Sequence, residues 1–208
     1  TSDPLLHRIL RSLRDWGRDC WCDPGRDNSC GHRFDGQYGE LPRGYDHKYV
    51  YSHLGYNLKA TDLQAAVGCA QLEKFPSFAR RRRENFTFLK KLLQDGGAER
   101  RLILPEASEN AAPSWFGFLM TAKEGTDRGR LVRYIEGKGI QTRMLFAGNL
   151  IRHPCFDELR SKGEGYRIVG ELTNTDRIMR DSFWVGLYPG MTEEKLSYMA
   201  EMILEGLG

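Results

Sequence analysis

The second half of the chain, from about residue 98 onward, is predicted to fold as a small α+β sandwich. Three short apolar runs there have the length and aromatic content of buried strands. The stretches between them carry apolar residues at helical spacing, with capping residues before them or glycines after them. Strands that alternate with helices in this way are typical of a small sheet packed against helices.

The predicted elements of this half follow one another along the chain. Strands are expected over residues 115–120, 140–146 and 183–187. A helix capped by Thr126 separates the first two strands, and residues 173–181 form a short helix before the third. Thr192 is predicted to cap the last helix. The inward face of that helix carries Leu196, Met199 and Ile203.

The first half begins with a predicted helix that ends at about Asp15. Asp3 suits its N-cap and Pro4 suits its first turn. Its apolar residues fall on one helical stripe: Leu5, Leu6, Ile9, Leu10 and Leu13. In residues 17–56 the apolar residues follow neither the helical nor the strand period over any length, which is typical of a functional or a disordered segment. The aromatic residues in this segment favour an ordered one.

Two further helices are predicted between the halves. The sequence from Thr61 to Gln64 is a capping box and starts the first helix, which is rich in small residues. Pro76 is expected to end that helix and to start a second one, which runs to about Gln94. The four arginines at 80–83 then lie on the solvated face of the second helix.

Composition indicates an ordinary globular protein. Charged residues make up 28% and hydrophobic residues 40% of the 208 residues, and the net charge of +3 is too small to predict a nucleic-acid partner. No apolar run reaches membrane-spanning length, so no membrane partner is expected either. The chain starts without Met, and we expect it to be a piece of a longer protein.

Cysteines are the most informative residues. Cys20, Cys22 and Cys30 fall within eleven residues, and the single residue between the first two disfavours a disulfide there. Three thiolates on one loop can converge on a soft metal or an iron–sulfur cluster, but both need a fourth ligand. A zinc site and three free surface thiols remain alternatives. Cys69 is expected to be a core residue, and Cys155 a buried or half-buried thiol, rather than that ligand. The odd total of five fits a reducing cytoplasm.

Three stretches of the sequence carry a resemblance to a known family. They read Arg-Asp-Trp-Gly-Arg-Asp-Cys-Trp-Cys at 14–22, Ser-His-Leu-Gly-Tyr-Asn-Leu-Lys-Ala-Thr-Asp-Leu-Gln-Ala-Ala at 52–66, and Gln-Thr-Arg-Met-Leu-Phe-Ala-Gly-Asn-Leu at 141–150. The chain resembles the C-terminal half of the DegT/DnrJ/EryC1/StrS sugar aminotransferase-like family. The cysteine loop is specific to its iron–sulfur 3-dehydrases, of the CDP-4-dehydro-6-deoxyglucose 3-dehydratase type.

The resemblance implies an α/β protein of aminotransferase fold type I. Residues 1–60 would then be the end of the large domain with the cysteine loop, and residues 61–97 would be linking helices. Residues 98–208 would be the small α+β domain, with a three-stranded, mainly antiparallel sheet. The family also implies a homodimer.

The resemblance implies a lyase that removes the C3 hydroxyl of a nucleotide-diphosphate-linked 4-keto-6-deoxyhexose. Its cofactors would be PMP (or PLP) and a 2Fe–2S cluster, which takes electrons from an NAD(P)H-dependent iron–sulfur flavin reductase. The product would enter deoxysugar biosynthesis, for lipopolysaccharide or a natural product. A catalytic His is expected before Thr1, so no catalytic residue is assigned here and the chain alone is expected to be inactive.

The resemblance also assigns roles to residues of this chain. Cys20, Cys22 and Cys30 match three of the four cluster ligands, and the fourth is expected upstream. Asn57 matches a residue that reaches the cofactor phosphate of the neighbouring subunit. The substrate-binding residues implied are Phe116, Arg143 and Asn149. Phe116 stands where related transaminases often have His, which favours a dehydrase.

Two alternatives remain from the sequence. One is a PLP-dependent nucleotide-sugar aminotransferase that happens to carry cysteines. The other is a non-catalytic module that binds zinc or a cluster, for which loss of folding on chelation would be the sign. Neither the nucleotide base nor the final sugar can be assigned from these residues.

Overall fold

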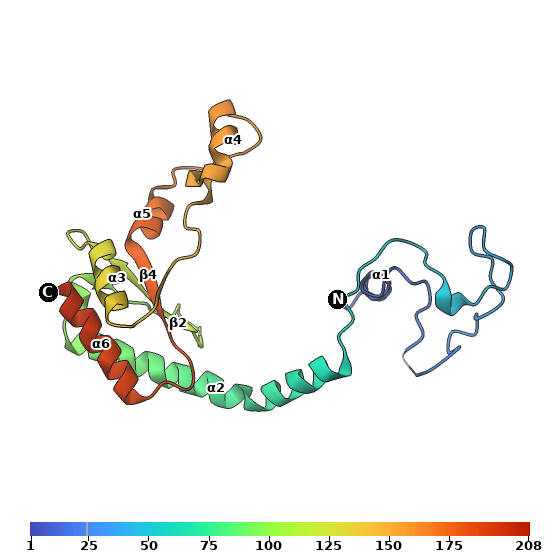
Figure 1. Ribbon diagram of the computed structural model, residues 1–208, viewed down its shortest axis with the longest axis horizontal. Coiled ribbons are helices and arrows are strands. Elements are labelled where there is room, and N and C mark those ends of the chain that lie inside the picture. Colours follow the sequence, from blue (N-terminus) through green and yellow to red (C-terminus); the bar gives the residue numbers. More distant parts are fainter. Residues whose placement is uncertain (24) are drawn as a thin grey trace. The chain divides into compact units, whose positions relative to one another are not determined.

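The computed structural model describes residues 1–23 and 25–208. The chain forms two units, Thr1–Gln71 and Leu72–Gly208 (Figure 1). The first is largely irregular and carries the cysteine loop, whereas the second carries the sheet. The three-part division at residues 1–60, 61–97 and 98–208 stays a prediction about the parent protein.

Helix α1 (Pro4–Arg14) opens the first unit as the sequence predicts. The side chain of Asp3 accepts a hydrogen bond from the Leu6 N–H at 2.9 Å, and Pro4 occupies the first turn. The apolar stripe of the helix is open to solvent, since Leu5, Leu6, Ile9 and Leu10 are 42–67% exposed. The stripe therefore predicts the helix, but no described residue of this unit covers it.

The segment after α1 is ordered by contacts between backbones rather than by secondary structure. Among its described residues, the one regular element is the 3₁₀ turn η1 (His47–Tyr49). Isolated antiparallel bridges join Asp15 to Asn57 and Arg18 to Tyr51, so the segment folds back on the end of α1. The described part of the segment therefore has defined backbone contacts, and its order in solution stays a prediction.

Two glycines allow this return. Gly17 has φ 84°, and a Cβ added to it would lie 1.9 Å from the carbonyl oxygen of His53. A Cβ on Gly55 would lie 2.3 Å from the backbone nitrogen of Gly17. Ser52 donates its N–H to the Gly17 carbonyl at 3.0 Å, across the same contact. Only residues without a side chain can let the two backbones approach this closely.

Helix α2 (Asp62–Asp95) corrects the prediction of two helices, because it continues through Pro76. The capping box forms as predicted: the Thr61 N–H donates to Gln64 Oε1 at 2.9 Å. Pro76 removes only one backbone donor, and the Ser77 hydroxyl donates to the Lys74 carbonyl at 2.7 Å in the same turn. The carbonyl that loses its donor is that of Leu72, a residue 71% exposed and therefore open to water, and the helix continues past the proline.

The second unit contains a four-stranded antiparallel sheet rather than the predicted three strands. Its order is β1 (Leu102–Ile103), β2 (Gly117–Ala122), β4 (Ser182–Gly186) and β3 (Thr142–Met144). The three predicted strands correspond to β2, β3 and β4. The additional edge strand has two residues, too few for a periodic signal in the sequence.

The helices of this unit largely follow the sequence signals. They are α3 (Arg128–Gly137), α4 (Asp157–Lys162), α5 (Thr173–Asp181) and α6 (Glu193–Leu207), with 3₁₀ turns η2 (Ala98–Arg100), η3 (Leu150–Arg152) and η4 (Pro154–Phe156). Thr192 caps α6 as predicted. The cap of α3 is Asp127 rather than Thr126, because the Asp127 carboxylate accepts from the Arg130 N–H at 3.0 Å.

The core lies on one face of the sheet. Phe118 and Met120 of β2 and Phe183 and Val185 of β4 are buried there. Helices α3 and α6 pack against each other over this face (Figure 1). The core residues from the helices are Leu89 and Leu93 of α2, Leu131 and Ile135 of α3, and Leu196, Met199 and Ile203 of α6. Because side chains alternate along a strand, Leu119 and Trp184 lie on the opposite face.

The arginines at 80–83 lie on α2, as predicted, and mostly face solvent. Two of them also bind backbone carbonyls of their own unit: Arg81 binds Met191, and Arg83 binds Ala112 at 2.7 Å. This run is therefore part of the packing of the second unit. No helix in the described ranges combines the length and the apolar character that crossing a bilayer requires.

We predict that Gly17→Ala locally opens the first unit. A left-handed φ strains any residue with a side chain by about 1–3 kcal/mol, and at this position the Cβ would also overlap the His53 carbonyl. Hydrogen exchange at the Ser52 amide should therefore accelerate. Gly39→Ala is the control, since Gly39 has φ 55° but open space around it. Equal acceleration at Ser52 in both variants would contradict the role of the close contact.

We also predict a pH dependence from Glu136. Hydrogen bonds from the Thr142 hydroxyl at 2.6 Å and the Thr142 N–H hold the pKa of Glu136 below its ordinary 4.5. The unfolded chain therefore binds this proton more readily, so the stabilisation is present above pH 4.5 and is lost as pH falls toward the folded pKa. Glu136→Gln keeps an acceptor but cannot titrate. Urea denaturation should show a weaker acid loss of stability in this variant, and an unchanged loss would refute the assignment.

Candidate functional site

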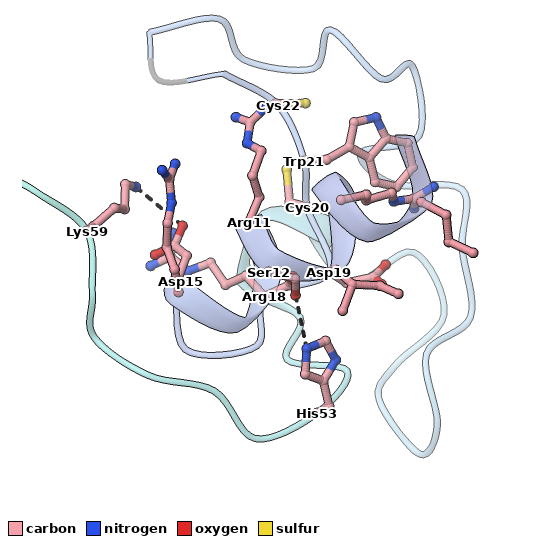
Figure 2. A pocket seen from close by; sticks show the side chains of 14 residues that line it. Arg11, Ser12, Asp15, Arg18, Asp19, Cys20, Trp21, Cys22, His53 and Lys59 are labelled. Atoms are coloured by element: carbon pink, nitrogen blue, oxygen red, sulfur yellow. Dashed lines mark hydrogen bonds and ion pairs between the residues drawn. The ribbon is translucent and has the colours of Figure 1, made fainter. Parts of the chain in front are cut away.

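The cysteine loop leaves the C-terminal end of α1 and lines a pocket there. Cys20, Cys22, Arg11, Arg18 and His53 all line this pocket. Figure 2 shows the two cysteines near Arg11, and His53 beside Ser12. The Ser12 hydroxyl donates to the Arg18 carbonyl and lies 3.3 Å from His53 Nε2, so the end of the helix is tied to the returning segment. Sulfur and cationic side chains therefore meet at one place in the first unit.

All three thiols line a second, adjoining cavity of about 170 Å³. Each of the three cysteines is half-buried and free of disulfides. The cationic side chains around this cavity are Arg18, Arg33, Lys48 and Lys59. The sequence places the three cysteines on one loop, and the fold brings their side chains to one cavity.

The electrostatics of this cavity favour one thiolate. The Ser29 hydroxyl, then the Cys30 N–H and the thiols of Cys30 and Cys20, lower the pKa of Cys22 from 9.0 to about 6, against the opposing effect of burial. Burial raises the pKa of the Cys20 thiol above its ordinary 9.0. Cys22 is therefore the thiol best suited to bind a metal as a thiolate at neutral pH.

His47 holds the interior of the loop together, a role that the sequence analysis did not identify. Its ring is 1% exposed; a hydrogen bond of 2.6 Å joins Nε2 to Asp19, and Nδ1 lies 3.9 Å from the Cys30 sulfur. The Tyr38 ring stacks on it with centroids 5.3 Å apart, and Trp21 meets it edge-on. Because these partners are far apart in sequence, only the fold reveals this cluster.

Ion pairs close the outside of the loop. Arg33 forms a two-pronged pair with Asp46, with nitrogen–oxygen distances of 2.9–3.1 Å. Lys48 pairs with Asp27 at 2.7 Å, and this contact holds the pKa of Asp27 below its ordinary value. The Lys48–Asp27 pair is exposed and contributes little stability by itself, whereas the Arg33–Asp46 pair is half-buried. Both pairs fix the path of the chain beside the cysteines.

Asn57 lies on the returning segment, where its backbone bridges to Asp15. The residue is exposed. On either side, the Tyr56 and Leu58 N–H groups donate to the carbonyls of Leu13 and Arg14, at 2.6 and 2.9 Å. The backbone around Asn57 is therefore fixed while its amide remains available to a ligand.

The three predicted substrate residues all belong to the second unit, but their surroundings differ. Phe116 is 58% exposed, and its ring meets Trp184 edge-on at 5.2 Å. Arg143 is exposed on β3, opposite Trp184 in the register. Asn149 is buried, and its amide donates to Asp176 at 2.7 Å, which ties the loop after β3 to α5. Phe116 and Arg143 are thus placed to meet a ligand, whereas Asn149 holds the loop beside them.

The two remaining cysteines correct an expectation. Cys69 and Cys155 are both exposed rather than buried. Cys69 lies on the part of α2 that no described residue covers, and Cys155 lies in the surface turn η4. Within residues 1–23 and 25–208, no three or more His, Cys, Asp or Glu side chains are grouped so that they could hold a metal ion.

The chemistry of the donors is nevertheless that of an iron–sulfur site. Three thiols, one of them with a pKa of about 6, share one cavity with Arg18, which forms no ion pair with a carboxylate among the described residues. The other cations of the cavity, Arg33, Lys48 and Lys59, are each paired with an aspartate. Thiolates are the usual ligands of such clusters. For a PMP phosphate, the chain offers the exposed amide of Asn57, a neutral donor suited to a phosphate oxygen. The residues present therefore fit both groups in donor type.

Comparison with known proteins finds relatives along the whole chain. It is 55% identical over 210 residues to the lipopolysaccharide biosynthesis protein RfbH of Salmonella typhimurium, covering 100% of this chain and 46% of the relative. It is 50% identical over 202 residues to the dTDP-4-dehydro-2,6-dideoxy-D-glucose 3-dehydratase of Saccharopolyspora spinosa, covering 96% of this chain and 42% of that protein. The chain thus spans less than half the length of these relatives.

A solved structure of a related enzyme has the same fold as this chain. A GDP-4-keto-6-deoxymannose-3-dehydratase with a trapped PLP-glutamate geminal diamine superposes with a TM-score of 0.73 and 25% identity. The match covers 98% of this chain and 49% of that one. The predicted aminotransferase-type α/β fold is thereby confirmed, apart from the strand count. The family model of the DegT/DnrJ/EryC1/StrS aminotransferases matches residues 36–204, and the chain belongs to that family.

Proposed function

We propose that the chain is part of a nucleotide-sugar 3-dehydratase that removes the C3 hydroxyl of a nucleotide-linked 4-keto-6-deoxyhexose. The observation that carries this proposal is the three-thiol cavity with its acidic Cys22, in a family otherwise named for amino transfer. Amino transfer gives three gathered thiols no role. Relatives named as 3-dehydratases support the same reaction.

Cys20, Cys22 and Cys30 are the residues that we assign to a 2Fe–2S cluster, with a fourth ligand elsewhere in the parent protein. Arg18, which forms no ion pair with a carboxylate among the described residues, would offset part of the negative charge of a thiolate-bound cluster at the cavity. Two electrons must enter for the net loss of the C3 oxygen, so the proposal includes an NAD(P)H-dependent iron–sulfur flavin reductase as partner. The free cysteines suit a reducing compartment, and we propose a cytoplasmic location.

Bound PMP would supply the electron sink for departure of the C3 hydroxyl, the usual contribution of this cofactor class. The part of this chain would be to hold its phosphate. We assign that role to the exposed amide of Asn57, acting on the cofactor of a second subunit in a homodimer. The base that moves the proton is proposed to lie outside this chain, so no residue here is assigned to that step.

Phe116, Arg143 and Asn149 are proposed to form the side of the substrate site that this chain supplies. Phe116 presents an exposed aromatic ring that cannot move a proton, which suits elimination better than a His at that place would. Arg143 presents a guanidinium group, a good partner for a diphosphate. Asn149 would act indirectly, by fixing the loop through Asp176.

A PLP-dependent nucleotide-sugar aminotransferase is the second candidate, because the family as a whole is named for amino transfer. The two reactions give different products from the same ketosugar: one loses the C3 oxygen, and the other replaces the keto oxygen by an amino group. The zinc-module alternative is less supported, since it gives the aminotransferase fold no role.

The proposal predicts that the parent protein, loaded with PMP and reconstituted with iron and sulfide, forms a 3-deoxysugar when a reductase and NADH are present. Mass spectrometry of the product should show one oxygen fewer. Cys22→Ser should abolish this product and reduce bound iron, because serine is a poor ligand for a soft cluster. The control is Cys69→Ser, which changes an exposed thiol outside the cavity. An amino sugar as the product, or full iron content in Cys22→Ser, would refute the proposal.

The role of Asn57 predicts weaker cofactor binding when its amide becomes a carboxylate. Asn57→Asp should raise the dissociation constant of PMP about ten- to hundredfold, because a charged hydrogen bond contributes about 1.5–3 kcal/mol and repulsion adds to its loss. PMP binding to the parent protein is measured by its absorbance after dialysis. Asn110→Asp makes the same charge change on an exposed turn of the second unit and should leave binding unchanged. Equal affinity for PMP in both variants would refute the assignment of Asn57 to the cofactor phosphate.

A further inference from the structure

The uncovered face of the sheet carries an aromatic pocket that the cluster and cofactor proposals do not use. The pocket has a volume of about 450 Å³, within the range of small-molecule sites. Its walls are mainly aromatic and apolar: Trp115, Phe116, Leu119, Phe146 and Trp184. One carboxylate, that of Glu106, lies among them. An apolar pocket with few polar groups is the usual form of a ligand site.

The Trp184 ring is held in one position. Its indole N–H donates to the Met144 carbonyl at 3.1 Å. The ring lies over Gly117, where an added Cβ would come within 2.5 Å of it, so any larger residue would displace it. Phe116 supports the ring edge-on, at an interplanar angle of 89°. The ring is thus fixed before any ligand arrives, which lowers the entropic cost of stacking on it.

Phe146 adds a second aromatic group under backbone strain. It has φ 48°, a left-handed conformation that is costly for a bulky residue, and its side chain is 77% exposed. An exposed aromatic residue gains nothing from burial that would offset the strain. Strain of this kind concentrates at ligand sites. The turn before it, closed by the Phe146 N–H on the Met144 carbonyl at 2.7 Å, keeps the ring at the pocket.

A cation stands on the same face of the sheet. Arg143 is the cross-strand partner of Trp184, and directly paired residues point to the same side of a sheet. Its guanidinium binds the Thr142 carbonyl at 3.2 Å, and it forms no ion pair with a carboxylate among the described residues. A cation beside a fixed aromatic plane is the combination that binds nucleotides.

We infer that this pocket receives the base of a nucleoside diphosphate. The base stacks on Trp184, Phe146 closes the pocket, Glu106 accepts an N–H from the base edge, and Arg143 binds the diphosphate. The inference deepens the proposed function, because it assigns the nucleotide part of the proposed substrate to this face. Hexose hydroxyl groups would find few partners on such apolar walls, whereas every base has an aromatic face.

The test is direct binding to the 208-residue chain, measured by saturation-transfer NMR and calorimetry with dTDP, GDP and CDP as probes. We expect saturation of base protons for at least one of the three. Trp184→Leu should weaken that binding about five- to hundredfold, since stacking contributes about 1–3 kcal/mol per base. Phe146→Leu, at an exposed position that tolerates change, should weaken it in the same direction and guards against misfolding of the first variant.

Three comparisons make the result decisive. Tyr198→Leu removes an exposed aromatic residue of α6, outside the pocket, and should leave binding unchanged. Arg143→Gln should weaken binding of the nucleoside diphosphate more than binding of the matching nucleoside. Pyrophosphate without a base should bind more weakly than the nucleotides. Binding that is unaffected in both Trp184→Leu and Phe146→Leu, or base protons that receive no saturation from any probe, would overturn the inference.

These outcomes separate the inference from the proposed reaction. Nucleotide binding that depends on Trp184, together with an amino-sugar product, would support the assignment of the base to this pocket and refute the proposed dehydration. A 3-deoxysugar product, together with nucleotide binding that is independent of Trp184, would support the proposed dehydration and refute the assignment of the base to this pocket. Repeating the titration with the parent protein tests whether another part of it covers this face. Binding that depends on Trp184 in the 208-residue chain but not in the parent protein would overturn the inference.

Discussion

The first unit depends on the close approach of two backbones at Gly17 and Gly55. This contact leaves no room for a Cβ on either side, and it turns the returning segment against the end of α1. Without it, a segment with only one 3₁₀ turn would have few contacts to offset the entropy of ordering. The same contact fixes the backbone on which Asn57 is exposed, so a packing constraint and a proposed cofactor contact share one cause.

The cysteine loop shows how a site can be built without regular secondary structure. Its interior is one buried imidazole, that of His47, which is bonded to Asp19, stacked on Tyr38 and close to the Cys30 sulfur. Buried polar groups need hydrogen-bond partners, and a side chain whose hydrogen bonds are all made is held in one position. The loop is therefore positioned from inside, while its thiols remain at a cavity where hydrogen bonds lower the pKa of Cys22 to about 6.

The sequence predicted what is encoded locally. Asp3, Thr192 and the Thr61–Gln64 box act as the caps that their residue types indicate, because a cap involves only a few adjacent residues. Two predictions failed for different reasons: the two-residue edge strand exists only by pairing with a distant strand, and Pro76 removes only one backbone donor from a long helix that continues past it. The cysteine spacing indicated a soft-ligand site, but the His47 cluster joins residues too far apart in sequence to be recognised.

On the aromatic face of the sheet, too, the residues are chosen for more than packing. Gly117, the first residue of β2, lies beneath Trp184, where only the absence of a side chain leaves room for a flat ring. Opposite Trp184, β3 carries Arg143 rather than an apolar residue that would extend the core. A sheet selected for stability alone would fill this face with apolar side chains, as Phe118, Met120, Phe183 and Val185 fill the face beneath α3 and α6. The choice of glycine, indole and guanidinium is better explained by a ligand than by the fold.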